Sequence, residues 1–159
     1  YPFVKASLLA GKHVVTSNKA LVAAYGTELL AIAREKNVNF FFEASVGGGI
    51  PIIRPLYRCL KGEKILEITG ILNGTTNFIL TKMDKEGASF EAVLKEAQDL
   101  GYAERNPEAD VEGYDTCRKI AILTAMASGK EVNYEDISTE VSQRLPMWIS
   151  STQTNWELP

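Results

Sequence analysis

An acidic stretch followed by a lysine is the strongest candidate for chemistry in this sequence. Glu104, Asp110 and Asp115 fall within one expected loop and the first turn of the next helix, and Lys119 lies four residues after Asp115. Because an α-helix has about 3.6 residues per turn, Asp115 and Lys119 share one helix face. Carboxylates can pair with an ammonium group, and a lysine can protonate a carbonyl oxygen during reduction. A solvated surface ion pair accounts for the same spacing equally well.

Three further segments place ligand-binding groups at the ends of expected strands. Lys19 follows a strand at a βα turn, where an open parallel sheet faces its ligand crevice. The glycine-rich turn at 43–50 offers N–H groups for an anion, or carbonyls and Glu43 for a cation. The segment 73–77 opens a helix with N–H groups and hydroxyls that suit a carboxylate. The alternatives are a solvated lysine, a tight turn with close backbone packing, and an ordinary helix cap.

The elements that must position these residues begin with a β-α-β unit. A short helix at 2–10 precedes a strand at 13–16, a helix at 19–36 and a strand at 38–43. Two strands joined by a helix are expected to be parallel and connected right-handedly. The following elements are expected to be a helix at 51–60, a strand of a second sheet at 65–72, helices at 73–85, 89–100 and 113–128, and an ordered loop at 101–112 over a pocket.

Composition limits the classes of function. The net charge is −3 and the sequence has no basic stripe, which argues against nucleic acid or an anionic membrane as partner and favours a small molecule. Cys59 and Cys117 share no metal or disulfide spacing, which suits a reducing cytosol. No apolar run reaches the roughly 18 residues of a membrane span. His13, the only histidine, is expected to be structural or exposed, and 40–42 to form a buried strand core.

Four motifs in this order resemble the homoserine dehydrogenases, over about residues 1–140. They are GKHVVTSNKA at 11–20, EASVGGGIP at 43–51, GILNGTTN at 70–77, and GYAE at 101–104 with DTCRK at 115–119. The resemblance implies an NAD- or NADP-dependent oxidoreductase that interconverts L-aspartate 4-semialdehyde and L-homoserine, on the route to threonine and methionine. It also implies a cytoplasmic homodimer whose subunits pair through the second sheet. The alternative is a noncatalytic substrate-binding or dimerisation fragment of such an enzyme.

The resemblance also implies roles for individual residues. Lys119 would be the proton donor, with Asp115 beside it. Substrate would be bound by Glu104, Asp110, Asp115 and Thr75. Lys19 and Gly101 would contact the cofactor. A monovalent cation such as sodium would be held by Glu43 and the carbonyls of Val46, Gly48 and Ile50.

The implied fold is α/β combined with α+β. Residues 1–45 would be the later part of a Rossmann-like nucleotide-binding domain, and 46–139 a substrate-binding and dimerisation domain with an open sheet covered by helices. Residues 140–159 differ from the family's usual continuation and are expected to be an atypical tail. The glycine-rich first βα unit of the family is expected upstream of residue 1, where the sequence begins without methionine.

Overall fold

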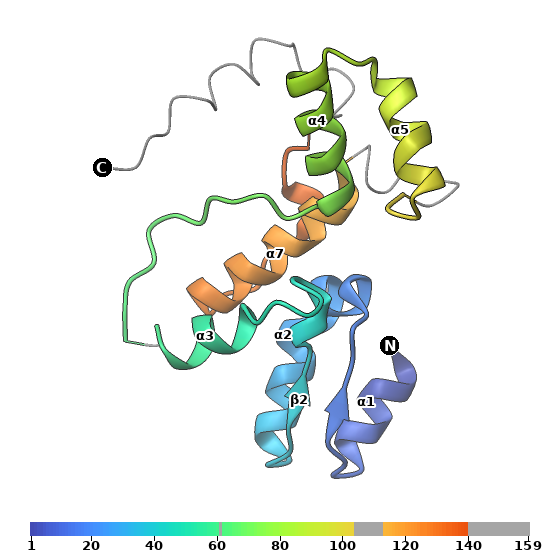
Figure 1. Cartoon of the computed structure of the whole chain (residues 1–159). Coiled ribbons are helices and arrows are strands. Elements are labelled where there is room, and N and C mark those ends of the chain that lie inside the picture. The colour runs from blue at the N-terminus through green and yellow to red at the C-terminus, as the bar shows by residue number, and fades with distance from the viewer. Residues whose placement is uncertain (61, 104–112, 140–159) are drawn as a thin grey trace. The chain divides into compact units, whose positions relative to one another are not determined.

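The structure is a computed structural model that describes residues 1–60, 62–103 and 113–139 (Figure 1). The described residues form two compact units. The first contains Tyr1–Leu72 and Cys117–Ile137, and the second contains the described part of Asn73–Thr116 together with Ser138 and Thr139. The long helix α7 (Tyr114–Ser128) contributes residues to both.

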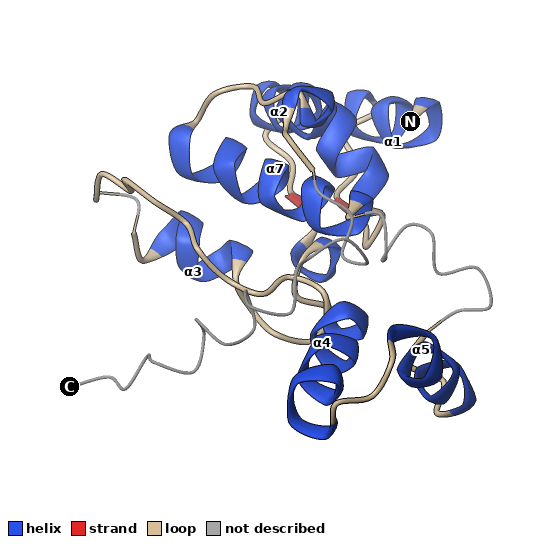
Figure 2. Cartoon of the chain, turned by 90° about the horizontal axis from the view of Figure 1, so that it is seen from above, coloured by secondary structure: helices blue, strands red, loops and turns tan. Residues whose placement is uncertain are grey.

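The first unit contains the expected β-α-β arrangement. Strand β1 (Val14–Val15) pairs in parallel with β2 (Phe40–Phe41), in the register Val14 to Phe40 and Val15 to Phe41. Helix α2 (Lys19–Glu35) connects the two strands, and α1 (Pro2–Leu9) packs beside α2, as the view from above shows (Figure 2). The prediction of a parallel strand pair joined by a helix is therefore confirmed, with strands shorter than expected.

Helix α2 forms because its start and one of its faces are both specified locally. Asn18 caps it by accepting a hydrogen bond from the N–H of Leu21 at 3.0 Å. Apolar or small residues at helical spacing face the interior. The buried core of this unit consists of Leu8, Val22, Leu29, Ala33, Phe40, Phe42, Val46, Ile53, Ile122 and Leu123.

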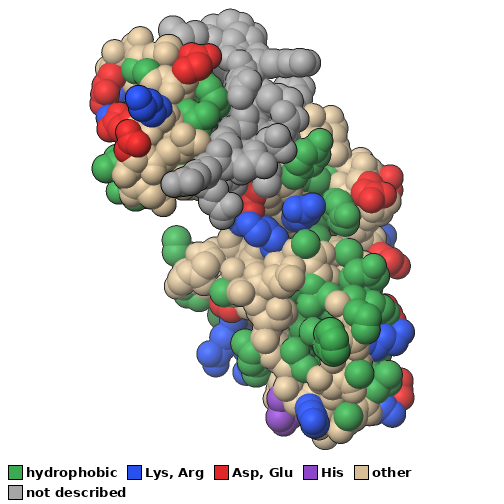
Figure 3. All heavy atoms as spheres, turned by 90° about the vertical axis from the view of Figure 1, so that its right-hand side faces the viewer, with side chains coloured by type: hydrophobic (Ala, Val, Ile, Leu, Met, Phe, Trp, Pro, Cys, Tyr) green, Lys and Arg blue, Asp and Glu red, His purple; other side chains and the backbone are tan. Residues whose placement is uncertain are grey.

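The aromatic strand follows the alternation of a half-covered sheet. Phe40 and Phe42 are 6% and 4% exposed, whereas Phe41 is 52% exposed. The prediction that all three are buried is wrong at Phe41, because successive side chains of a strand point to opposite faces. Its register partner Val15 is also exposed. On the face drawn in Figure 3, hydrophobic side chains gather in the lower part of the view, where the histidine also lies.

The second unit is built around a helical hairpin. Helix α4 (Gly74–Glu86) begins at the cap Asn73 and ends at Gly87, whose φ of 64° is the left-handed conformation that glycine adopts easily. Helix α5 (Phe90–Asp99) begins at the cap Ser89. The helices pack through Ile79, Val93 and Ala97, and Ala103 from the turn after α5 joins the same buried cluster. Lys82 on α4 adds an ion pair of 2.6 Å with Glu96 on α5.

The predicted strand at 65–72 is wrong. These residues have no regular secondary structure in the chain and form part of the long loop before α4 (Figure 1). A strand needs a backbone partner for its N–H and C=O groups. Among the described residues the only sheet is the β1–β2 pair, so this segment has no strand to pair with. The preceding helix is also shorter than expected, since α3 spans Ile53–Arg58.

Short 3-10 helices at η1 (Glu43–Ser45) and η2 (Tyr134–Asp136) complete the described elements. Among all the helices of the described residues, none is both long enough and apolar enough to cross a membrane. The expected tail at 140–159 lies outside the described residues. The domain boundary near residue 45 and the homodimer stay predictions.

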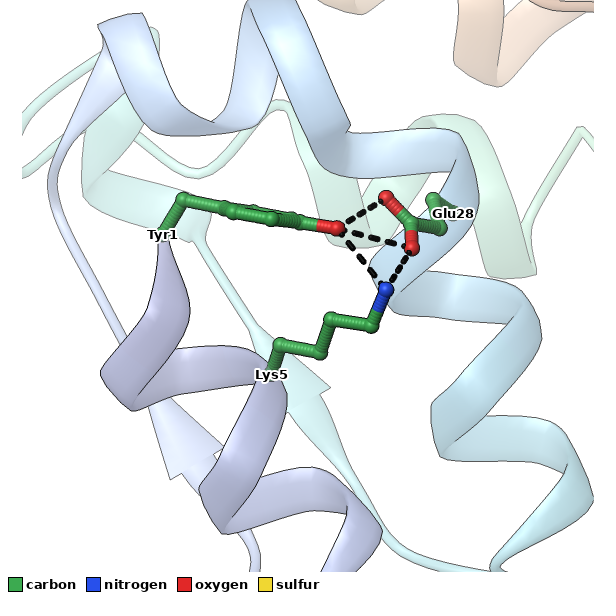
Figure 4. Close-up of polar contacts among 3 residues, drawn as sticks. All are labelled: Tyr1, Lys5 and Glu28. Atoms are coloured by element: carbon green, nitrogen blue, oxygen red, sulfur yellow. Dashed lines mark hydrogen bonds and ion pairs between the residues drawn. The ribbon is translucent and has the colours of Figure 1, made fainter.

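A surface ion pair joins α1 to α2 (Figure 4). The Nζ of Lys5 lies 2.7 Å from Oε1 of Glu28, and the Tyr1 hydroxyl donates to the same carboxylate, 2.6 Å from Oε2. The hydrogen bond from Lys5, followed by that from Tyr1, holds the pKa of Glu28 below its usual range. The same contacts raise the pKa of Lys5. The pair is therefore charged over the whole neutral range.

Replacing Glu28 by glutamine is expected to lower the free energy of unfolding at neutral pH, and the deficit is expected to shrink as the pH falls. A carboxyl group whose pKa is lowered by folding stabilises the folded state above its unfolded pKa of about 4.3, and this contribution is lost below it. Urea unfolding of both proteins at pH 7, 5 and about 3 measures the difference. Added salt should also reduce it, because both partners are exposed.

Glu63→Gln is the matched control, because Glu63 is exposed and its side chain makes no ion pair with described residues. A Glu28→Gln deficit that grew on acidification would contradict the ion-pair assignment.

Candidate active site

The helix α7 carries both residues of the predicted catalytic pair, Asp115 in its first turn and Lys119 one turn later. Asp115 is only 2% exposed. Its Oδ2 accepts a hydrogen bond of 3.1 Å from Nδ2 of Asn73, a residue that is itself 6% exposed. A carboxylate so far from water is stable only when it is hydrogen-bonded or paired. The alternative interpretation, a solvated surface ion pair, therefore does not fit Asp115.

Lys119 is half-buried, and its Nζ donates a hydrogen bond of 2.8 Å to the backbone carbonyl of Leu72. An ammonium group has three N–H donors, so this bond aims the side chain and uses one of them. Leu72 directly precedes Asn73 in the chain. Two consecutive residues of the loop before α4 therefore contact the two candidate catalytic residues of α7, one through a backbone carbonyl and the other through a side-chain amide.

Thr75 and Gly101 come from separate motifs and lie near one another in the second unit. The Thr75 hydroxyl is in a buried side chain and donates to the carbonyl oxygen of Tyr102 at 2.9 Å. Gly101 has a φ of 76°, which ends α5 in the left-handed conformation. The structure thus joins the start of α4 to the turn after α5.

Glu43 has a definite structural partner, the start of helix α3. Its Oε1 accepts hydrogen bonds from the backbone N–H groups of Ile52 at 2.6 Å and Ile53 at 2.7 Å, and its Oε2 accepts one from Arg54 at 2.9 Å. The first N–H groups of a helix lack partners within the helix. The N-cap residue of α3 is Ile52, whose apolar side chain cannot accept a hydrogen bond from them. The Glu43 carboxylate therefore supplies the cap from a distance along the chain.

The glycine-rich turn lies between Glu43 and α3. Ile50 donates its N–H to the carbonyl of Gly47 at 2.9 Å, and a Cβ at Gly47 would collide with the carbonyl oxygen of Ile50. Gly48 has a φ of 60°. Within the described residues no group of three or more histidine, cysteine or acidic side chains could hold a metal ion. The predicted cation site depends mainly on backbone carbonyls, so this finding does not test it.

Of the remaining predicted site residues, the structure describes Lys19 but not Glu104 or Asp110. Lys19 is half-buried at the first position of α2, directly after the cap Asn18. Glu104 and Asp110 lie outside the described residues.

Cys117 is buried, and burial raises the pKa of its thiol, whereas Cys59 is exposed. His13 is exposed and its Nδ1 accepts from the N–H of Asn39 at 2.9 Å, in agreement with its expected structural role.

Asn73 was missed as a site residue by reasoning from the sequence, which indicated only a helix cap there. A single buried amide can cap a helix and contact a carboxylate at once, because it carries both an acceptor and donors. The signal was the position of Asn73 within the third motif, GILNGTTN at 70–77. Nothing in the sequence pairs it with Asp115, which lies 42 residues away.

Comparisons with known proteins agree with these motifs. Residues 51–153 match the family model described as homoserine dehydrogenase. A homoserine dehydrogenase of Bacillus subtilis is 54% identical over 134 residues, which are 84% of this chain and 31% of that protein. Among solved structures, a homoserine dehydrogenase from Thiobacillus denitrificans has a TM-score of 0.86 at 48% identity, covering 92% of this chain and 34% of the other.

A hyperthermophilic archaeal homoserine dehydrogenase in complex with NADPH has a TM-score of 0.77 at 41% identity, covering 82% of this chain and 40% of the other. The chain spans about a third of the length of the curated relatives it matches. The family match covers well over half of the chain and includes α3, the cap of α4 and the helix with Asp115 and Lys119. The chain therefore belongs to the homoserine dehydrogenase family.

Proposed function

We propose that this chain contributes the substrate-reducing site of an NAD(P)-dependent oxidoreductase that interconverts L-aspartate 4-semialdehyde and L-homoserine. The observation that carries the proposal is the family match over 51–153, which contains a buried Asp115 and an aimed Lys119 on one helix. The relatives have the same named activity, and one structural neighbour was solved with NADPH.

In the proposed reaction the nicotinamide cofactor supplies a hydride to the aldehyde carbon when it is bound. Lys119 gives a proton to the aldehyde oxygen, so that the C=O bond becomes the C–O–H of homoserine. In the direction of oxidation Lys119 takes that proton back. Lys119 would then be a catalytic residue, with its direction set by the Leu72 carbonyl.

The acidic residues would bind the amino-acid end of the substrate. Asp115 is a desolvated carboxylate, so its attraction to a substrate ammonium is weakened less by water than that of a surface group. We assign the same role to Glu104 and Asp110. Thr75 would bind the substrate, and Lys19 and Gly101 would contact the cofactor, as the resemblance implies.

The glycine-rich turn would hold a monovalent cation. Its support is the donor set: the carbonyl oxygens of Val46, Gly48 and Ile50 accept no hydrogen bond among those of the described residues. Carbonyl oxygens are suitable ligands for such ions. The Glu43 carboxylate has about four lone-pair sites, of which three N–H groups use three, so it could contribute one more contact.

The complete gene product is expected to reduce NADP⁺ or NAD⁺ in the presence of L-homoserine. The measurement is the absorbance of the reduced nicotinamide, with each cofactor in turn and with L-serine in place of homoserine as control. Homoserine has one more methylene than serine, which changes the reach between ammonium and hydroxyl. A folded protein without homoserine-dependent reduction of either cofactor would rule out the proposal.

A further inference from the structure

The side chain of Asn73 is held at both of its ends. Its Oδ1 accepts a hydrogen bond from the backbone N–H of Thr76 at 2.8 Å and another from the Thr76 hydroxyl at 3.0 Å. These bonds make Asn73 the N-cap of α4. Its Nδ2 donates to Oδ2 of Asp115 at 3.1 Å. Both Asn73 and Asp115 are at least nine-tenths buried.

The direction of the Asn73 amide is fixed by chemistry. A backbone N–H can only donate, so the amide atom that faces Thr76 must be the oxygen. The NH₂ group then has to face Asp115. Turning the amide over would place two donors against each other at Thr76 and two acceptors against each other at Asp115. The cap of α4 therefore determines that Asp115 meets a donor.

A fixed donor matters because Asp115 is almost completely out of water. A hydrogen bond to the charged form of a carboxyl group favours that form and opposes the effect of burial. It also restricts rotation of the carboxylate, which prepares it for a partner of defined position. The amide carries no charge, so it can orient Asp115 without neutralising it.

From this arrangement, and resting on the proposed function, we infer that Asn73 is a positioning residue for homoserine binding. It holds the Asp115 carboxyl group turned toward the ammonium group of the substrate. Asn73 acts through Asp115 and needs no contact with the substrate. The same side chain thus caps α4 and orients Asp115, so the formation of the α4 start and the orientation of the substrate-binding carboxyl group depend on each other.

Two substitutions remove the donor and keep the cap. Serine and aspartate are both good N-cap residues, so α4 should still form in Asn73→Ser and Asn73→Asp. Serine is too short to replace the amide donor, and aspartate places a second acceptor opposite Asp115. In the complete gene product we expect kcat/KM for homoserine to fall about 10- to 100-fold, the usual effect of losing a hydrogen bond to a charged group. The KM for NADP⁺ should change less than about twofold.

The matched control for the added charge is Ser89→Asp. Ser89 caps α5 by accepting from Ala92, so the substitution adds the same charge at another helix start. It should leave the kinetics unchanged. Thermal unfolding of all variants shows whether the hairpin is intact.

A second comparison separates positioning from a purely structural role. If Asn73 acts through Asp115, then Asn73→Ser should cost little further activity in a protein that already carries Asp115→Asn. Additive losses, or normal homoserine kinetics in both Asn73 variants, would overturn the inference. An unsubstituted protein that fails to oxidise homoserine would instead refute the proposed function, and this inference with it.

Discussion

Replacing Lys119 by alanine is expected to lower kcat for homoserine oxidation about 10²- to 10⁴-fold, the usual contribution of a positioned general acid or base. The loss should fall on the chemical step, because Lys119 is the residue that would exchange a proton with the substrate oxygen. The Leu72 carbonyl, 2.8 Å from Nζ, would lose its donor, but the remaining site would still bind substrate. Steady-state kinetics at several pH values and a direct titration with NADP⁺ measure the two effects separately.

Two variants show whether proton transfer, and not charge alone, is lost. Lys119→Arg keeps the positive charge but cannot give up its proton near neutral pH, so it should be impaired almost as strongly as the alanine variant. Lys130→Ala removes an exposed lysine just after the end of α7 and should have near-normal kinetics. Near-normal kcat in Lys119→Ala at every pH would exclude Lys119 as the proton donor.

Replacing Glu43 by alanine is expected to lower the free energy of unfolding by about 2–4 kcal/mol, because three charge-assisted hydrogen bonds disappear together. The expected loss is less than three times that of one such bond, since water can reach part of the start of α3. Urea unfolding followed by circular dichroism gives the value. Glu43→Gln should be intermediate, because the amide keeps one acceptor oxygen and loses the charge.

Glu35→Ala provides the comparison for Glu43. Glu35 is an exposed acid at the end of α2, paired only with its neighbour Lys36 among the described residues, and its loss should cost less than about 0.5 kcal/mol. A similarly small effect at Glu43 would mean that the cap of α3 is unimportant. The same proteins can be unfolded in sodium and in choline chloride, since a bound cation would stabilise the folded state in sodium alone.

The parts of the fold that could be predicted are those specified by neighbours in sequence. Asn73 and Ser89 start their helices with bonds to residues three positions later, so the sequence of each cap contains both partners. The strand pair was predictable because two apolar runs flank one long helix. The predicted strand at 65–72 had the correct alternation, but periodicity does not show whether a partner strand exists.

The candidate site was predictable as a set of motifs and not as a set of contacts. The spacing of Asp115 and Lys119 predicted that they share a helix, but it could not show that Asp115 is buried and Lys119 half-buried. Asp115 accepts a hydrogen bond from Asn73, 42 residues before it, and the cap of α3 depends on Glu43, nine residues before Ile52. Such contacts join residues that are far apart in sequence, and local periodicity carries no information about them.

The fixed orientation of the Asn73 amide also affects how fast Asn73 is expected to deamidate. Asn73 is followed by Gly74, and asparagine before glycine is the pair in which a backbone nitrogen most readily attacks the side-chain amide, releasing ammonia through a cyclic imide. That attack requires the amide to swing toward the next peptide nitrogen. Here the bonds to Thr76 and Asp115 hold it elsewhere, within a buried residue. The folded state therefore protects this asparagine–glycine pair from deamidation. The rate of spontaneous deamidation at Asn73 should accordingly depend on how often the start of α4 unfolds locally.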